Sequence, residues 1–137
     1  MSNLDFLASV PAFRDLSIDE QRWLDDRLKS RSFKQGEIIV REGDPAEEAY
    51  VLQRGEVQVR RHQGGELASL HPTDVFGEIA LVDHRRRSAT LVAVTAAECL
   101  VVPKRAFQTL LEQNHAFSLS MLRLVLTRLA ELEASAR

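Results

Sequence analysis

Cysteine is almost absent from this sequence. Its 137 residues contain one, Cys99, so an internal disulfide and an all-protein multi-cysteine zinc or iron–sulfur site are both excluded. Cys99 lies in an apolar, strand-like run, which favours a buried structural thiol over a nucleophile. We therefore expect no redox or thiol chemistry from this chain.

Other sequence signals of catalysis and metal binding are missing too. The four histidines form no His-x-His or His-Glu-x-x-His pattern and have no grouped carboxylates beside them. No Ser–His–Asp or Cys–His arrangement, P-loop or glycine-rich dinucleotide motif stands out. We expect no catalytic residue, no metal site, no cofactor and no enzymatic activity.

Long apolar runs and a large net charge are also absent. No run approaches the roughly 18 apolar residues that a membrane-spanning helix needs. The formal net charge of −2 gives no general attraction to nucleic acid or to an anionic membrane. The N-terminal segment lacks the basic region of a secretory signal, so the expected location is the cytoplasm. Nucleic acid and membrane partners are not expected for this chain.

What is present describes one globular domain, residues 1–137, because apolar residues make up 45% and charged residues 28% of an unbroken chain. Three zones differ in hydrophobic period. Residues 1–29 read as helical, and Ser17 with Glu20 resembles a capping box. Residues 103–137 read as two further helices, of about 104–113 and 115–134, and the second has more apolar surface than one sheet can cover.

Residues 30–102 between the helices read as β-structure. Glycine and proline stops separate short β-prone runs. These runs cover residues 37–41, 49–53, 57–61, 67–70, 89–94 and 99–102. In one of them Val57 and Val59 face one side while Gln58 and Arg60 face the other. The zone predicts an α+β, mainly β fold: a jelly-roll β-barrel flanked by N-terminal helices and two C-terminal helices.

The segment 76–90, FGEIALVDHRRRSAT, carries the strongest chemical signal. An exposed-looking Gly-Glu turn and a short apolar helical turn come just before three arginines. Backbone N–H groups at a helix start favour an anion, and a guanidinium can hold phosphate oxygens with two hydrogen bonds. Because Glu78 repels a phosphate, it implies a hydroxyl-bearing part of the ligand. A sugar phosphate meets both demands.

With these residues in place, the chain resembles the cyclic nucleotide-binding domain family of catabolite activator-type regulators, kinase regulatory subunits and nucleotide-gated channels. The glycines of FKQGEIIVREGDPAEEAYVLQRGEVQV look like the family's turns, and the segment 76–90 looks like its phosphate-binding cassette. Many members have proline before the phosphate arginine, where this chain has Arg86. The resemblance implies a non-catalytic receptor for cAMP or cGMP, with cAMP favoured, that signals by movement of its last helix.

The resemblance also implies a role for each cassette residue. Glu78 would accept a hydrogen bond from the ribose 2′-hydroxyl, while Arg87 and Ser88 would bind the cyclic phosphate. Backbone N–H groups near Gly77, Ile79, Ala80 and Ala89 would complete the phosphate site, and Phe76 would support it from the core. The family's base contact has no hydroxyl counterpart in residues 130–133, which leaves Arg123 or Arg128 stacking on the base as a hypothesis.

Several alternatives stay open. Arg87 and Glu78 could form an internal salt bridge in a degenerate, ligand-free interaction or dimerisation domain. Arg85 and Arg86 read as solvated. The apolar surplus of the last helix could bind a second copy, an effector protein or the ligand. The chain could also be a sensor fragment of a larger regulator or channel.

Overall fold

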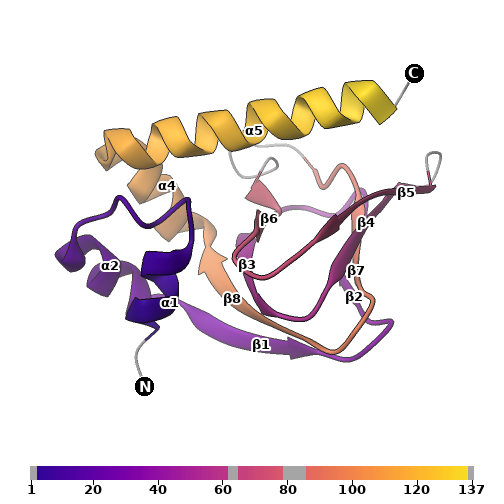
Figure 1. Cartoon of the computed structure of the whole chain (residues 1–137), viewed down its shortest axis with the longest axis horizontal. Helices are drawn as coiled ribbons and strands as arrows, with labels where there is room; N and C mark the ends of the chain where they lie inside the picture. The colour runs from indigo at the N-terminus through magenta and orange to yellow at the C-terminus, as the bar shows by residue number, and fades with distance from the viewer. Residues whose placement is uncertain (1–2, 62–64, 79–85, 136–137) are drawn as a thin grey trace.

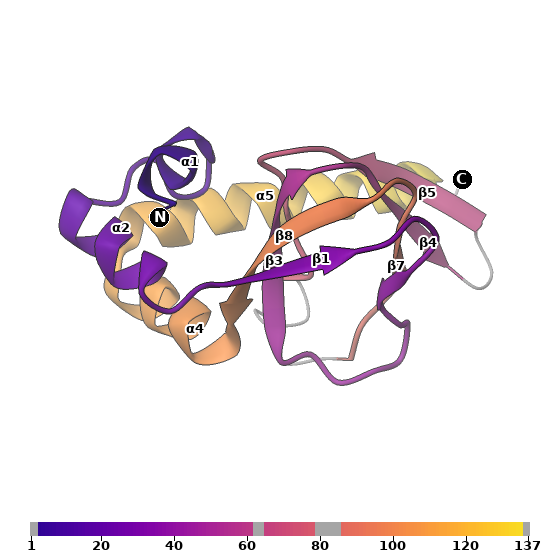
Figure 2. The same ribbon diagram turned by 90° about the horizontal axis from the view of Figure 1, so that it is seen from below.

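A computed structural model describes residues 3–61, 65–78 and 86–135 of the chain. Helices α1, α2 and α4 gather at one end and most of the β-structure lies at the other, while α5 runs along both (Figures 1 and 2). None of the helices within these ranges combines the length and hydropathy that a bilayer crossing requires.

The described strands form two four-stranded sheets in which every adjacent pair is antiparallel. The first sheet contains, in order, β1 (Lys29–Phe33), β8 (Ala97–Pro103), β3 (Glu48–Arg54) and β6 (Val75–Phe76). The second contains, in order, β2 (Ile38–Val40), β7 (Thr90–Ala93), β4 (Val57–Arg61) and β5 (Gly65–Leu70). This arrangement confirms the mainly β jelly roll with flanking helices, and in the described residues the two sheets are not closed into a barrel.

Two strands lie where the sequence predicted none. The sequence of β1, KSRSF, shows no apolar alternation, and four of its five residues are exposed. Its first residue, Lys29, also belongs to the zone predicted as helical. Pairing with the buried strand β8 nevertheless holds β1 in the sheet. The other missed strand, β6, has only two residues, Val75 and Phe76, which is too short for a period to show.

The buried side chains form two clusters. The helical cluster joins α1, α2, α4 and α5 to one face of the first sheet, and Phe13, Phe107 and Phe117 lie in it. Phe117 stacks on Phe13 at 5.7 Å between ring centroids and meets Phe107 edge-on at 5.6 Å. The sheet cluster lies between the two sheets and contains Tyr50 and Phe76. The functional site is built against this second cluster.

Helices α1 (Leu4–Ser9) and α2 (Ile18–Asp25) form the N-terminal part of the helical cluster. The predicted capping box is confirmed, because Ser17 N donates to Glu20 at 2.9 Å and Glu20 N donates to Ser17 Oγ at 3.1 Å. Trp23, on α2, packs half-buried against this cluster, and Arg27 lies over its ring at 4.1 Å.

Helices α4 (Lys104–Gln113) and α5 (His115–Ser135) agree with the predicted pair. Asn114 separates them: its side-chain oxygen accepts from Phe117 N at 2.8 Å, and its amide donates to Glu20 at 2.6 Å. Helix α5 buries Phe117 and Met121. On its outer side four leucines are exposed, at 36% for Leu119, 54% for Leu122, 56% for Leu126 and 41% for Leu129.

Candidate functional site

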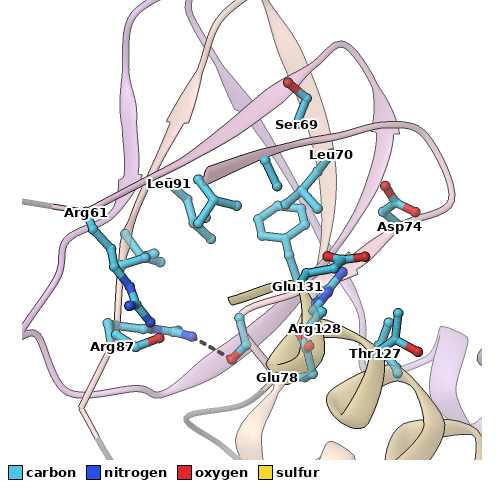
Figure 3. Close-up of a pocket in the computed structure, with 18 residues that line it drawn as sticks. Arg61, Ser69, Leu70, Asp74, Glu78, Arg87, Leu91, Thr127, Arg128 and Glu131 are labelled. Atoms are coloured by element: carbon cyan, nitrogen blue, oxygen red, sulfur yellow. Dashed lines mark hydrogen bonds and ion pairs between the residues drawn. The ribbon is translucent and has the colours of Figure 1, made fainter. Parts of the chain in front are cut away.

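A cavity of about 290 Å³ lies between the second sheet, the β6–β7 connection and α5 (Figure 3). Strands β2, β4, β5 and β7 supply a mainly apolar wall, in which Arg61 and Ser69 are the polar side chains. Helix α5 supplies the opposite wall with Leu124, Thr127, Arg128 and Glu131. Residues of the predicted cassette lie between these walls. The cavity therefore brings together segments that are far apart in the sequence.

Six of the eight predicted site residues line this cavity: Phe76, Gly77, Glu78, Arg87, Ser88 and Ala89. The other two, Ile79 and Ala80, lie outside the described residues, as does Arg85. Arg86 is exposed, as predicted, and donates to Gly43 O at 3.0 Å.

Arg87 is held by the backbone of the β-structure. Its side chain is buried, at 6% exposure, and donates to Gly77 O at 2.7 Å and to Glu48 O at 2.6 Å. Both partners are neutral carbonyls, and no carboxylate of the described residues forms an ion pair with it. Burial lowers the pKa of Arg87, although an arginine keeps its charge at neutral pH. A buried cation with only neutral partners attracts an anion.

Gly77 makes the close approach to Arg87 possible. Its φ of +78° lies in the left-handed region that favours glycine. A Cβ at this position would lie 2.7 Å from Arg87 Nη1, which is closer than such atoms can approach. The glycine therefore permits both the backbone conformation of the turn and the close packing of the Arg87 guanidinium against it.

Glu78 is held differently, by a cation from α5. The pattern read its turn as exposed, which is wrong, because the residue is fully buried at 0% exposure. Arg128, whose side chain is 18% exposed, donates to Glu78 Oε1 and to Val75 O. The alternative pairing of Glu78 with Arg87 is not found among the described contacts. The second carboxylate oxygen, Oε2, is buried without a hydrogen-bond partner in the described part of the chain.

Sequence reasoning missed Arg128 as the partner of Glu78, although a signal was available. Phe117, Met121, Leu124 and Arg128 recur at helical spacing, so Arg128 continues the inward face of α5. A cation on an inward face requires a buried partner. Arg123, the other arginine considered for the base, is exposed.

A second missed contributor is Glu48 on β3, whose main-chain oxygen holds Arg87. Its carboxylate accepts from Tyr50 Oη at 2.5 Å and from Arg31 Nη1 at 2.9 Å. Burial, followed by the bond to Glu48, raises the pKa of Tyr50. Tyr50 also stacks on Phe76 at 5.2 Å, and Phe76 is buried in the sheet cluster.

Cys99, His71 and His115, to which the sequence assigned no chemical role, do not line the cavity. Cys99 is fully buried, and burial raises the pKa of its thiol to about 12, which keeps it protonated and unreactive. His71 and His115 are exposed, and the other two histidines lie outside the described ranges. Within those ranges no group of three or more metal-ligating side chains occurs.

Comparison with known proteins shows which family this chain resembles. Residues 30–114 match the cyclic nucleotide-binding domain. The cAMP-dependent protein kinase regulatory subunit of Dictyostelium discoideum is 35% identical over 113 residues, which cover 77% of this chain and 35% of that protein. The chain thus spans about a third of the length of this relative.

Solved structures give the same result. The cAMP-bound PfPKA-R fragment superposes with a TM-score of 0.87 at 26% identity, covering 96% of this chain and 45% of that one. The catabolite activator protein of Thermus thermophilus superposes with a TM-score of 0.78 at 30% identity, covering 92% and 61%.

Proposed function

Because this chain belongs to the cyclic nucleotide-binding domain family, we propose that residues 1–137 form one receptor domain that binds a cyclic nucleotide and catalyses no reaction. The observation that carries the proposal is the state of Arg87: a buried guanidinium whose described partners are all neutral carbonyls. A cyclic phosphate would give this guanidinium a direct anionic hydrogen-bond partner.

Each cassette residue has a role in this proposal. Arg87 would pair with the phosphate oxygens, and Ser88, on the cavity wall, would add a hydroxyl. The backbone near Gly77, Ile79, Ala80 and Ala89 would complete the phosphate site. The unpartnered Oε2 of Glu78 suits a ribose 2′-hydroxyl, because a buried acceptor without a donor is costly and a hydroxyl would satisfy it.

We favour cAMP over cGMP as the ligand. The Dictyostelium relative is named as cAMP-dependent and the PfPKA-R structure contains cAMP, which supports this choice. Ser88 is compatible with either nucleotide, since its hydroxyl could bind the phosphate in both complexes.

The signal would pass through α5. Arg128 on this helix contacts Glu78, and Glu78 is the proposed ribose ligand, so nucleotide binding and helix position share one carboxylate. A ligand moves an equilibrium only by contacting two states differently, and this shared carboxylate provides such a difference. We infer that occupancy of the cavity changes the position or rigidity of α5.

Calorimetry with cAMP and cGMP tests the binding proposal directly. Wild-type protein should bind cAMP, and Arg87→Ala should lose on the order of 100-fold in affinity, because the change removes a charge-assisted pair and leaves a phosphate unpaired. The matched control is Arg86→Ala, which removes the neighbouring exposed charge and should change affinity by less than about threefold. Absence of heat with both nucleotides would reject the proposal and favour the ligand-free interaction domain.

The partner we propose is a second copy of this chain, bound through the leucine stripe of α5. The stripe consists of Leu119, Leu122, Leu126 and Leu129. Its spacing of three, four and three residues is that of a two-helix seam. Replacing both Leu122 and Leu126 by lysine should convert a dimer to a monomer in sedimentation equilibrium, with the paired change Glu112→Lys and Gln113→Lys on α4 as a surface control. A wild-type monomer would reject the second copy and leave a kinase catalytic subunit, suggested by the names of the relatives, as the next candidate.

A further inference from the structure

Two charged residues of the cavity wall, Arg61 and Asp74, belong to neither the cassette nor α5, and Arg61 is the cation of the two. Arg61 is the last residue of β4 and lines the cavity together with Val59. Alternation along a strand places Val57, Val59 and Arg61 on the same face. Val57 is fully buried and Val59 packs against the sheet cluster, so this face is the inner one. Arg61 therefore occupies a position at which the strand pattern calls for an apolar side chain.

The guanidinium of Arg61 is incompletely satisfied. The residue is half-buried, and its Nε atom is buried with no hydrogen-bond partner in the described part of the chain. A buried N–H without an acceptor is unfavourable. Such a group in a cavity wall favours an acceptor other than those that the described residues supply.

Arg61 and Arg87 lie at the same end of the cavity. Figure 3 shows both side chains directed into one corner, away from Asp74 and Thr127 on the opposite side. Neither arginine forms an ion pair with a carboxylate among the described residues. Two like charges in a partly desolvated corner repel each other, and an anion between them converts the repulsion into attraction.

We propose that Arg61 is a second phosphate-binding residue, which acts with Arg87 to bracket the anionic group of the ligand from the β4 side. This inference deepens the proposed function and rests on it. The proposed phosphate end of the cavity then has two cations, Arg61 from β4 and Arg87 from the cassette. Affinity then depends on β4 as well as on the cassette.

The site predicts how substitutions of Arg61 differ. Arg61→Gln removes the charge, and affinity for cAMP should fall about tenfold. Arg61→Lys keeps a point charge, which serves a phosphate, so most of the affinity should remain. Arg60→Gln is the matched control. It removes a charge one residue away, from an exposed side chain whose guanidinium is bonded to Gln58 at 2.7 and 3.2 Å, and it should leave affinity within about twofold.

Calorimetry with cAMP on wild type and these three variants decides the question, and each is first checked for an unchanged circular dichroism spectrum. The expected order of affinity is wild type and Arg60→Gln, then Arg61→Lys, then Arg61→Gln. Wild-type affinity in Arg61→Gln would overturn the inference while leaving the proposed function intact. Equal loss in Arg61→Lys and Arg61→Gln would also overturn it, because that result indicates stacking of the planar guanidinium on the base. Failure of wild type to bind cAMP or cGMP would reject the proposed function itself.

Discussion

Among the described residues that line the cavity, Glu78 and Arg87 are the two buried charged side chains, and they are held in opposite ways. Arg87 bonds to two main-chain oxygens, one in the cassette turn and one on β3, and needs nothing from the C-terminal helices. Glu78 is neutralised by Arg128, which belongs to α5. One end of the cavity is therefore completed by the sheets, and the other end only when α5 is in place.

In the proposed function, this difference would separate ligand binding from the response of α5. A guanidinium fixed by backbone carbonyls loses little freedom when an anion arrives, so the proposed phosphate end would be preorganised. A carboxylate shared with a helix can exchange one contact for another, so its environment can change with helix position. The comparison predicts that substitutions at the Glu78 end alter stability and helix coupling most, whereas those around Arg87 alter ligand affinity most.

The largest stability effect is expected from breaking the Glu78–Arg128 pair. Arg128→Gln leaves a fully buried carboxylate without its cation, which should lower the free energy of unfolding by about 3 kcal/mol. The double variant Glu78→Gln with Arg128→Gln buries no charge at this pair and should recover most of that loss. Urea unfolding midpoints measure both. Arg123→Gln, an exposed arginine on the same helix, is the control and should have little effect.

A double variant no more stable than Arg128→Gln would contradict the pairing as the source of stability. In that case the Glu78 end would not depend on α5 more than the Arg87 end does, and the contrast between the two ends would be wrong.

The next largest effect concerns the turn beneath Arg87. Gly77→Ala and Gly36→Ala both place alanine at positive φ, at +78° and +85°, which costs about 1 kcal/mol in each case. At Gly36 a Cβ meets nothing within 4 Å, whereas at Gly77 it would lie 2.7 Å from Arg87 Nη1. We expect Gly77→Ala to cost a further ~1 kcal/mol or more and to weaken cAMP binding at least tenfold.

Calorimetry and urea unfolding on the two glycine variants separate backbone strain from the contact with Arg87. Equal stability and equal affinity in the two variants would show that Arg87 can move without loss, contrary to a preorganised phosphate end.

The smallest effect is expected from the hydrogen bonds of the Glu48 carboxylate, which do not contact Arg87 directly. Tyr50→Phe removes a hydrogen bond to the Glu48 carboxylate, which keeps its contact with Arg31 at 2.9 Å. Stability should fall by about 1 kcal/mol, and cAMP affinity should stay within about threefold, because Arg87 is held by the main-chain oxygen of Glu48. A larger loss of affinity in a filter-binding assay would show that the phosphate end depends on this outer network too.

Local patterns account for what could be predicted from the sequence. The Ser17–Glu20 capping box, the helix Lys104–Gln113 and the cassette segment are each specified by residues a few positions apart. The contacts that distinguish the two ends of the cavity are not local. Arg128 and Glu78 lie 50 residues apart, and the oxygen that holds Arg87 lies 39 residues away on β3.

The missed contacts differ in how visible they were in the sequence. A main-chain oxygen such as that of Glu48 leaves no trace in the residue type, so no pattern could have indicated it. Arg128 left a partial trace as a cation on an inward helical face, but the identity of its partner depends on how α5 crosses the sheets. The strand β1 depends on pairing with β8 and not on its own polar residues.

The place of Trp23 has a practical consequence. It is the one tryptophan of the sequence, it packs against the helical cluster, and it does not line the cavity. A ligand in the cavity therefore has no direct route to quench it. Its emission on nucleotide addition becomes an intrinsic optical readout of the helices. The unmodified protein therefore carries its own reporter of whether an event in the cavity reaches the other end of the molecule.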